Sequence, residues 1–287
     1  MTVYFIGAGP GAPDLLTLRA DRLIRSCPVC LYAGSIVPPE VLANCPDDAD
    51  VINTARMPLE DIIDVIAKAD AEGKDVARLQ SGDPSVWSAL AEQARRLTAA
   101  GIDYEIVPGV ASFSAAAAAL GHELTVPTVG QSVILTRVSG RASAMPDGET
   151  LDNFGRTGAT LCIHLAAHDI DRVVAELEPN YGADCPAAVV AFASRPEEVI
   201  LRGTLGDIAA QVKETGWDMC TTASNHSIDA GTEGLVHTLN VLDEAGIVHA
   251  GSARSQEEFD APRMFETAEG VKIAVVAGTY GLNGLIP

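Results

Sequence analysis

Glycine, proline and small hydroxyl or amide side chains meet in three stretches of the chain, at residues 7–14, 81–85 and 108–112. Each stretch follows a short apolar run, as a loop follows a buried strand. Glycine lets the backbone approach a ligand closely, and N–H groups at a helix start are free to bind it. The three stretches are ordinary strand–helix turns or, as we expect, a ligand site at the carboxyl ends of parallel strands.

The first loop does not match a dinucleotide site. Its glycines, Gly7, Gly9 and Gly11, give G-x-G-P-G, whereas the dinucleotide fingerprint is G-x-G-x-x-G followed by an acidic residue after the second strand. Pro10 lacks an N–H group that a pyrophosphate would use. The second expected strand ends in Leu-Tyr-Ala-Gly at residues 31–34, without a carboxylate for a ribose. We therefore disfavour a nicotinamide or flavin dinucleotide.

Composition narrows the class of protein. The 287 residues carry a net charge of −20, which disfavours nucleic acid and anionic membranes as partners but allows an anionic small molecule that local arginines bind. No apolar run reaches the length of a membrane span, and no basic segment opens a secretion signal. Of six cysteines, only Cys27 and Cys30 form a C-x-x-C pair. A redox or zinc role is the alternative to ordinary reduced thiols, which we favour in a cytoplasmic protein.

The first 120 residues alternate between strand and helix patterns. We expect strands at 3–6, 28–32, 51–53, 75–79 and 104–107, and helices at 15–24, 59–71, 85–100 and 113–120. Asp14 is the expected N-cap of the first helix, and Pro39 the expected start of a short one. This alternation predicts an α/β fold with a mostly parallel sheet and helices on both faces.

A second unit follows a linker at residues 121–130. We expect strands at 133–137, 160–165, 187–192 and 199–203, a helix at 169–178, a helix capped by Thr204 that runs to Glu214, and a polar loop at 137–158. The predicted domains are residues 1–120, 121–216 and 217–287.

Several motifs together resemble a known family, the uroporphyrinogen and precorrin methyltransferases. The motifs are Gly-Ala-Gly-Pro-Gly at 7–11, Ser-Gly-Asp-Pro at 81–84 and Pro-Gly-Val-Ala-Ser at 108–112. Within the family, residues 31–38 and 131–137 are similar to members that methylate C-11 of precorrin-4 or cobalt-precorrin-4 in cobalamin biosynthesis. The resemblance covers residues 1 to about 216. It implies a two-domain tetrapyrrole methyltransferase fold, each domain a mixed sheet flanked by helices, in a homodimer that binds both ligands between domains.

The resemblance also implies a binding site for S-adenosylmethionine, the methyl donor. Carried over by position, its contacts are Pro10, Ser81, Gly82, Asp83, Val86, Ala111, Ser112, Leu165 and Ala193. Asp83 would lie near the cationic end of the donor, or would simply cap a helix. Methyl transfer needs alignment rather than a nucleophilic triad, because the ring carbon of the tetrapyrrole attacks, and the sequence identifies no catalytic base. Arg56, Arg137 and Arg141 are candidates to pair with substrate carboxylates, with solvated surface arginines as the alternative.

Residues 217–287 depart from that family and resemble part of the capsule-synthesis (poly-gamma-glutamate) proteins, which have a metallophosphoesterase-like fold. Asn225 and His226 would there lie in a metal site, but the upstream Asp-x-His and later histidines are missing, so we expect no metal. We expect a helix at 233–245 and strands at 264–267 and 271–277. Residues 217–223 either replace the lost last strand of the second domain or leave its edge open.

Three functions follow. The first is methyl transfer to a precorrin, and the second is a fusion that binds S-adenosylmethionine but turns over poorly. The third is a metal-dependent phosphoesterase or envelope polysaccharide factor.

Overall fold

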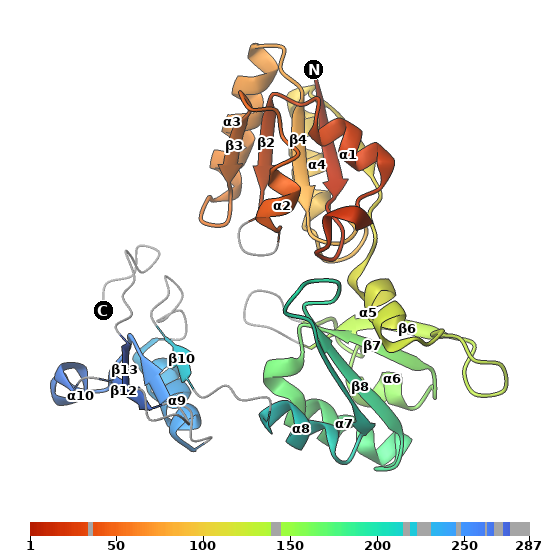
Figure 1. Ribbon diagram of the computed structural model, residues 1–287, viewed down its shortest axis with the longest axis vertical. Coiled ribbons are helices and arrows are strands. Elements are labelled where there is room, and N and C mark those ends of the chain that lie inside the picture. The colour runs from red at the N-terminus through yellow and green to blue at the C-terminus, as the bar shows by residue number, and fades with distance from the viewer. Residues whose placement is uncertain are drawn as a thin grey trace. The chain divides into compact units, whose positions relative to one another are not determined.

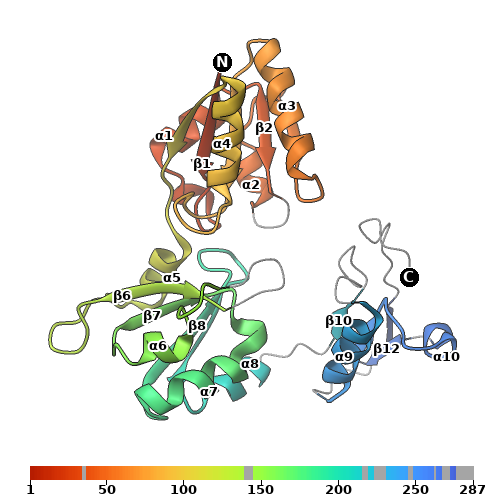
Figure 2. The same cartoon turned by 180° about the vertical axis from the view of Figure 1, so that it is seen from behind.

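The computed structural model describes residues 1–33, 37–138, 145–214, 219–222, 231–244, 248–261, 263–266 and 272–275. The chain divides into two compact units, Met1–Ala209 and Ala210–Pro287. Figure 1 labels their helices and strands, and Figure 2 presents them from behind. Within the described residues, no helix combines the length and the apolar character that crossing a membrane requires.

A five-stranded parallel sheet forms the first half of the first unit. Its strands are β1 (Thr2–Gly7), β2 (Val29–Tyr32), β3 (Asp50–Asn53), β4 (Val76–Gln80) and β5 (Asp103–Val107). Their order is β3-β2-β4-β1-β5, and every neighbouring pair is parallel. The three glycine-containing loops therefore follow adjacent strands, β4, β1 and β5, at one edge of the sheet.

Helices cover both faces of this sheet. Helices α1 (Leu18–Ile24) and α2 (Pro39–Leu42) pack on one face, while α3 (Leu59–Ala71) and α4 (Leu90–Ala100) pack on the other. Helix α2 begins at its proline, as predicted. Helix α3 has the predicted bounds and turns an apolar stripe inward, with its isoleucines in the second cluster.

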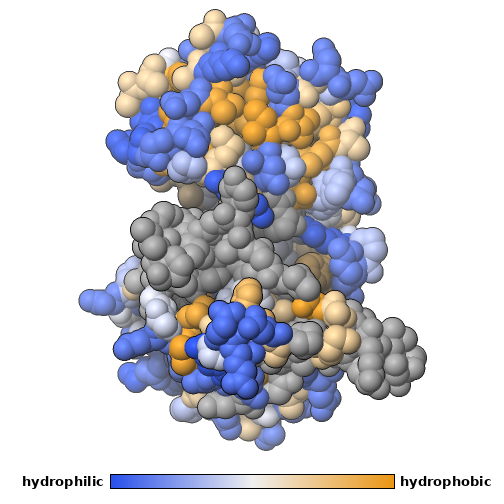
Figure 3. Space-filling view, turned by 90° about the vertical axis from the view of Figure 1, so that its left-hand side faces the viewer, coloured by the Kyte–Doolittle hydropathy of each residue, from blue (hydrophilic) through white to orange (hydrophobic). Residues whose placement is uncertain are grey.

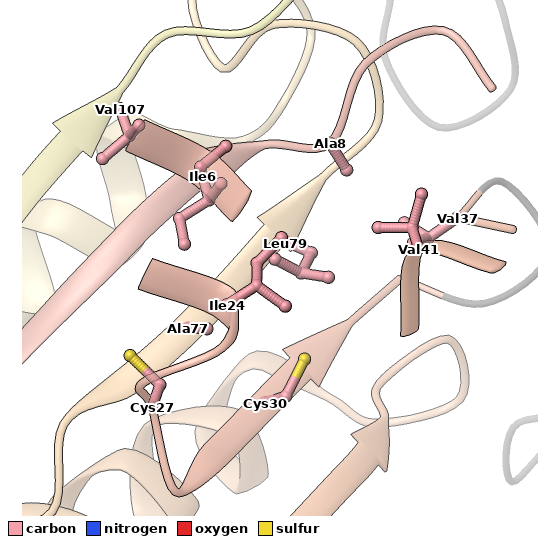
Figure 4. Close-up of a cluster of buried hydrophobic side chains, with 11 residues drawn as sticks. Ile6, Ala8, Ile24, Cys27, Cys30, Val37, Val41, Ala77, Leu79 and Val107 are labelled. Atoms are coloured by element: carbon pink, nitrogen blue, oxygen red, sulfur yellow. The ribbon is translucent and has the colours of Figure 1, made fainter. Parts of the chain in front are cut away.

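The C-x-x-C pair belongs to the core. Figure 4 shows Cys27 and Cys30 among the side chains of the cluster beneath α1 and α2. Burial raises the pKa of the Cys27 thiol to about 12. A hydrogen bond with Cys45, together with burial, raises the pKa of the Cys30 thiol. Both thiols are therefore protonated at neutral pH and pack as small apolar groups.

The second half of the first unit has two separate strand pairs. Strands β6 (Val133–Arg137) and β7 (Thr160–His164) are parallel, whereas β8 (Pro186–Ala191) and β9 (Val199–Thr204) are antiparallel. The helices are α5 (Ser112–Leu120), α6 (Leu151–Gly155) and α7 (Ile170–Tyr181), with a 3-10 helix, η3 (Ala167–Asp169). Helix α8 (Ile208–Glu214) begins in the first unit and ends in the second. Helices α6 and α7 contribute to one apolar cluster. The predicted α/β class is confirmed, although the first sheet is parallel throughout rather than mixed.

Some local expectations were wrong. Asp14 lies inside a 3-10 helix, η1 (Pro13–Leu15), and Thr17 caps α1 instead by accepting a hydrogen bond from Ala20 N. Thr204 lies in β9 and is not a helix cap. The expected loop at 137–158 contains α6, which Thr150 caps. In each case a nearby hydroxyl or strand pairing satisfies backbone groups that the sequence pattern had assigned elsewhere.

The second unit builds its own strand pairs. Its elements are β10 (Met219–Thr221), α9 (Gly231–Glu244), β11 (Val248–Ala250), α10 (Gln256–Asp260), β12 (Arg263–Glu266) and β13 (Lys272–Val275). β10 pairs in parallel with β11, and β12 pairs antiparallel with β13. The expected helix and final strand pair are confirmed. Residues 219–221 pair with β11, and the replacement of the last strand of the second domain by residues 217–223 stays a prediction.

Candidate cofactor and substrate site

The loops after β1 and β4 are joined by backbone hydrogen bonds. Gly9 N donates to Gly82 O at 3.2 Å, and Gly82 N donates to Gly9 O at 2.8 Å. Both glycines have positive φ, +74° for Gly9 and +67° for Gly82, a region that residues with a Cβ adopt at a cost. The pairing brings together the segments that contain Pro10, Ser81 and Gly82, three of the expected cofactor residues.

Close backbone packing explains the other glycines of these loops. A Cβ on Gly7 would lie 2.5 Å from Gly109 N and 2.8 Å from Gly82 O, too close for any side chain. The neighbouring atoms are backbone and cannot rotate away. The loops after β1, β4 and β5 thus meet backbone to backbone, without side chains between them.

Asp83 ties the second loop to the third. Its Oδ2 accepts a hydrogen bond from Gly109 N at 2.8 Å, and its Oδ1 accepts one from Ser85 N at 2.8 Å. Burial raises the pKa of Asp83, but the hydrogen bonds from Ser85 and Gly109 outweigh it, so that the pKa lies below its ordinary value. Asp83 is therefore ionised at neutral pH. It is not a helix cap, because α4 begins only at Leu90.

Strained backbone gathers around these loops. Positive φ angles occur at Trp87 (49°), Ala89 (51°), Leu165 (55°), Phe192 (52°) and Ser194 (69°). Such angles cost roughly 1–3 kcal/mol each at residues other than glycine, and they persist where surrounding contacts enforce them. They also explain why the helix expected from residue 85 begins at Leu90: its predicted first turn is not helical.

His164 lies between the two halves of the first unit. Its ring centroid is 4.6 Å from that of Trp87 and 6.4 Å from that of Phe113, and its Nδ1 is 3.4 Å from Ser112 Oγ. Burial lowers the pKa of the His164 imidazole below its ordinary value, so the ring is neutral at pH 7. Because Leu165 follows His164 directly, the contact brings Leu165 toward Ser112, both of which the resemblance assigns to the cofactor.

The loop after β8 contacts the loop after β1. Ala12 N donates to Ser194 Oγ at 3.0 Å, and Ser194 N donates to Glu198 Oε2 at 2.7 Å. Gly11 lies against Arg195, whose Cγ would be 2.5 Å from a Cβ at position 11. Ala193, beside Ser194, is thereby brought toward the loop that contains Pro10.

The structure therefore gathers the nine expected cofactor residues on connected loops. They are Pro10, Ser81, Gly82, Asp83, Val86, Ala111, Ser112, Leu165 and Ala193. Arg137 ends β6 and lies opposite His164 in the strand register, while Arg56 is exposed in a turn after β3. Within the described residues, no hydrogen bond or ion pair joins Arg56 to the loops. Arg141 lies outside the described residues.

Two surface hollows lie elsewhere in the described chain. One hollow is lined by α9 residues including His237, and another by residues of β2, β3 and α3 including Lys68; neither is lined by an expected site residue. In the ranges that the structure describes, His, Cys, Asp and Glu do not gather in groups that could hold a metal ion. Asn225 and His226 lie outside these ranges.

Comparison with known proteins identifies the family. The model of the tetrapyrrole (corrin/porphyrin) methylases matches residues 2–209. This chain belongs to the tetrapyrrole methylases. A precorrin-4 C(11)-methyltransferase of Rhodococcus erythropolis is 63% identical over 216 residues, 75% of this chain and 87% of that protein. A cobalt-precorrin-4 C(11)-methyltransferase of Methanocaldococcus jannaschii is 46% identical over 215 residues, 75% and 83% of the two chains.

Solved tetrapyrrole methylases share the fold. The X-ray structure of a cobalt precorrin-4 methyltransferase, a cobalamin biosynthetic enzyme, superposes with a TM-score of 0.73 at 38% identity, covering 75% of this chain and 90% of that one. A uroporphyrin-III C-methyltransferase from Thermus thermophilus, complexed with S-adenosylhomocysteine, gives a TM-score of 0.63 at 29% identity, with 74% and 92% covered. The resemblance inferred from the motifs is confirmed, and the chain is an S-adenosylmethionine-dependent methyltransferase by family.

The rest of the chain matches a second family. The model of the bacterial capsule synthesis protein PGA_cap matches residues 171–285, which overlaps the methylase match at 171–209. This confirms the resemblance inferred for the tail.

Sequence reasoning missed the residues that link the methylase loops across long distances in the chain. They are Trp87, Phe113, His164, Ser194 and Arg195. The one usable signal was position, since each is adjacent to, or two residues from, an expected cofactor residue.

Proposed function

We propose that this chain transfers the methyl group of S-adenosylmethionine to C-11 of precorrin-4 or cobalt-precorrin-4 in cobalamin biosynthesis. The observation that carries the proposal is that the loops after β1, β4 and β5 meet at one edge of the first sheet and are contacted by the loops that follow β7 and β8. The 63% identity to a precorrin-4 C(11)-methyltransferase supports the substrate.

The loops suit this methyl donor chemically. Gly7, Gly82 and Gly109 leave no side chain between the backbone and a ligand, which fits a molecule recognised through backbone hydrogen bonds. Asp83 supplies an ionised carboxylate close to where a cationic ligand would lie. When bound, S-adenosylmethionine supplies a methyl group already activated on a sulfonium.

The chain's own residues then act by orientation and by excluding water. Alignment of two bound reactants can lower a barrier by roughly 7–11 kcal/mol. Trp87, Leu165 and Phe192 are exposed apolar side chains on strained backbone around the site, 44%, 72% and 53% exposed, and a flat macrocycle would cover them. Of the arginine candidates, Arg137 lies beside His164 and is best placed to pair with a substrate carboxylate. Arg56 and Arg141 remain candidates for its other carboxylates.

A homodimer in the cytoplasm is part of the proposal. Figure 3 shows an apolar band on the part of the surface formed by the first sheet and its helices, bordered by hydrophilic side chains. Bands of this kind are typical of surfaces that a partner covers. The five cysteines whose side chains the structure describes form no disulfide, as in a reducing compartment.

Calorimetric titration of the intact chain with S-adenosylhomocysteine, the demethylated product, tests the donor site. We expect one saturable site per chain, and thermal stabilisation that grows with ligand concentration. Turnover of precorrin-4 and of cobalt-precorrin-4 by the same preparation then tests the acceptor. Absence of both heat and stabilisation would exclude the proposed function.

A second candidate is a fusion that binds the donor but turns over poorly. The match of residues 171–285 to a capsule synthesis family favours it, because that match begins inside the methylase part. A chain ending at residue 216 separates the two candidates. If turnover rises severalfold when the tail is removed while binding of S-adenosylhomocysteine is unchanged, the tail impairs the enzyme.

A further inference from the structure

A group of buried polar side chains lies beneath the loop that joins β4 to α4. Thr54, Arg78 and Gln93 are each at most 5% exposed. Arg78 lies in β4, the strand that leads directly into the loop with Ser81 and Asp83. No carboxylate among the described residues pairs with its guanidinium, and burial lowers the pKa of Arg78 to about 10, so it still bears a charge at neutral pH.

Hydrogen bonds run from Arg78 in two directions. In one direction, Arg78 Nη1 donates to Thr54 Oγ1 at 2.9 Å, and Thr54 Oγ1 donates to Tyr32 O at 3.0 Å. In the other direction, Arg78 Nε donates to Gln93 Oε1 at 3.1 Å, and Gln93 Nε2 donates to Ala89 O at 3.3 Å. The second direction ends at the residue that immediately precedes α4.

Arg78 thereby sets the orientation of the Gln93 amide. Because the amide oxygen of Gln93 accepts from Arg78, its NH₂ group is turned toward the carbonyl of Ala89. Ala89 has φ of +51° and Trp87 has φ of +49°, so this stretch needs contacts that enforce its conformation. The Gln93 amide supplies one of them, at the point where the strained stretch enters the helix.

We propose that Arg78 is a positioning residue for methyl transfer, which acts through Gln93 to hold residues 83–89 in the conformation that places Asp83 and Trp87 at the cofactor site. This inference rests on the proposed function. An arginine suits the role because its planar fork donates in two directions at once, which a lysine ammonium on a flexible stem does not reproduce.

Stability alone does not account for Arg78. A buried charge without a carboxylate partner loses much of its hydration, and apolar replacements of buried charged groups are often neutral or stabilising. The apolar neighbours on this face of the sheet would accept such a side chain, because α3 and α4 already form an apolar cluster there. What an apolar side chain could not do is orient Gln93.

Three substitutions in the full chain separate positioning from stability. Gln93→Glu keeps an acceptor for Arg78 but removes the donor to Ala89. Arg78→Met removes both directions of the network. Thr54→Val, the matched control, breaks the direction that leads away from the loop and leaves the Gln93 contact in place.

We expect Gln93→Glu and Arg78→Met to raise the Kd for S-adenosylhomocysteine about tenfold, because a tenfold change in Kd corresponds to roughly the free energy that one hydrogen bond contributes. We expect kcat to fall up to ~100-fold, since small misplacements of aligned groups are costly, and KM for the tetrapyrrole to change little. Thr54→Val should keep Kd within about twofold of the parent, even if its thermal unfolding temperature falls. Trp87 provides a direct readout of the loop, because its fluorescence in the unliganded chain should change in the first two variants and not in the control.

Binding of S-adenosylhomocysteine by Gln93→Glu within about twofold of the parent would overturn the inference, as would unchanged fluorescence of its Trp87. A Trp87→Phe chain identifies which part of the emission belongs to that residue rather than to Trp217. Should Arg78→Met fail to fold, Gln93→Glu decides alone, because it keeps the buried guanidinium bonded. Failure of the proposed function is a separate outcome, since the parent itself would then not bind S-adenosylhomocysteine.

Discussion

Replacing Asp83 by asparagine tests the connection between the second and third loops. The carboxylate accepts two backbone hydrogen bonds, from Gly109 N and Ser85 N, each at 2.8 Å. Asparagine keeps one acceptor oxygen and turns an NH₂ group toward the other N–H donor. Loss of one charge-assisted bond, with a backbone donor left unpaired, costs about 2 kcal/mol. In a unit of this size that lowers the unfolding temperature by roughly 4–8 °C.

The assay is thermal unfolding together with titration with S-adenosylhomocysteine. We expect Asp83→Asn to unfold at a lower temperature and to bind more weakly, because the loop that begins at Gly109 is no longer held to the loop after β4. Asp14→Asn is the matched control, since Asp14 is exposed in the described structure and caps no helix. An Asp83→Asn chain that unfolds and binds as Asp14→Asn does would refute the role of this carboxylate.

The same substitution has a pH signature. The pKa of Asp83 is lower in the folded chain than its ordinary value of 3.8. Its contribution to stability is therefore complete above the unfolded pKa and is lost as the pH falls through the folded pKa. The difference in unfolding free energy between the parent and Asp83→Asn should be constant from pH 8 to about pH 5 and should shrink below about pH 4. A difference that grew on acidification would contradict the assignment.

Three further predictions concern the same loops. Gly7→Ala should lower the free energy of unfolding by about 3 kcal/mol or more, because its Cβ would meet the backbone of Gly109. The control Gly73→Asn should cost at most about 1 kcal/mol, because Gly73 has open space around it and φ of +68°. Equal unfolding midpoints of the two variants in urea would disprove the packing argument. Burial lowers the pKa of His164, so the contribution of its neutral ring to stability is complete above about pH 6.5 and falls as the solution is acidified. His164→Phe should therefore show a smaller drop in unfolding temperature between pH 7.5 and pH 5.5 than the parent does. Parallel profiles of unfolding temperature against pH would count against this prediction. Ser194→Ala should raise the Kd for S-adenosylhomocysteine severalfold, because it removes the partly buried hydrogen bond from Ala12 N. The free energy of unfolding should change by no more than about 1 kcal/mol. An unchanged Kd would show that this contact does not shape the site.

Local patterns were sufficient to predict the sheet and its loops. Alternating strand and helix patterns fixed five parallel strands within one or two residues of their observed bounds, because each strand is an apolar run closed by glycine, proline or a polar residue. The glycines of the three loops were correctly placed at one edge. The reason for glycine at these positions is the direct contact of Gly7 with Gly109. That contact could be predicted only once the order of the strands in the sheet was known.

Long-range contacts set the features that the sequence did not reveal. The start of α4 depends on positive φ at Trp87 and Ala89, and these angles depend on contacts that no local pattern encodes. Arg78 lies in a segment whose pattern predicts an ordinary buried strand. Only the structure shows that Arg78 is buried without a carboxylate partner in the described residues and is bonded to Thr54 and Gln93 instead. His164 likewise gains its neighbours from residues more than 50 positions away.

The described strands of the tail pair with one another. β10 pairs with β11, and the pairing is extended by hydrogen bonds from Thr222 N to Ala250 O at 2.8 Å and from Ser252 N to Thr222 Oγ1 at 2.9 Å. Its one fully buried polar side chain in the described range, His249, bonds through Nε2 to Asp243 of the same unit at 3.0 Å. Residues 219–221 therefore have a strand partner inside the tail. The loops of the methylase are joined to one another by contacts within Met1–Ala209, so we expect a chain that ends at residue 216 to keep its binding of S-adenosylhomocysteine.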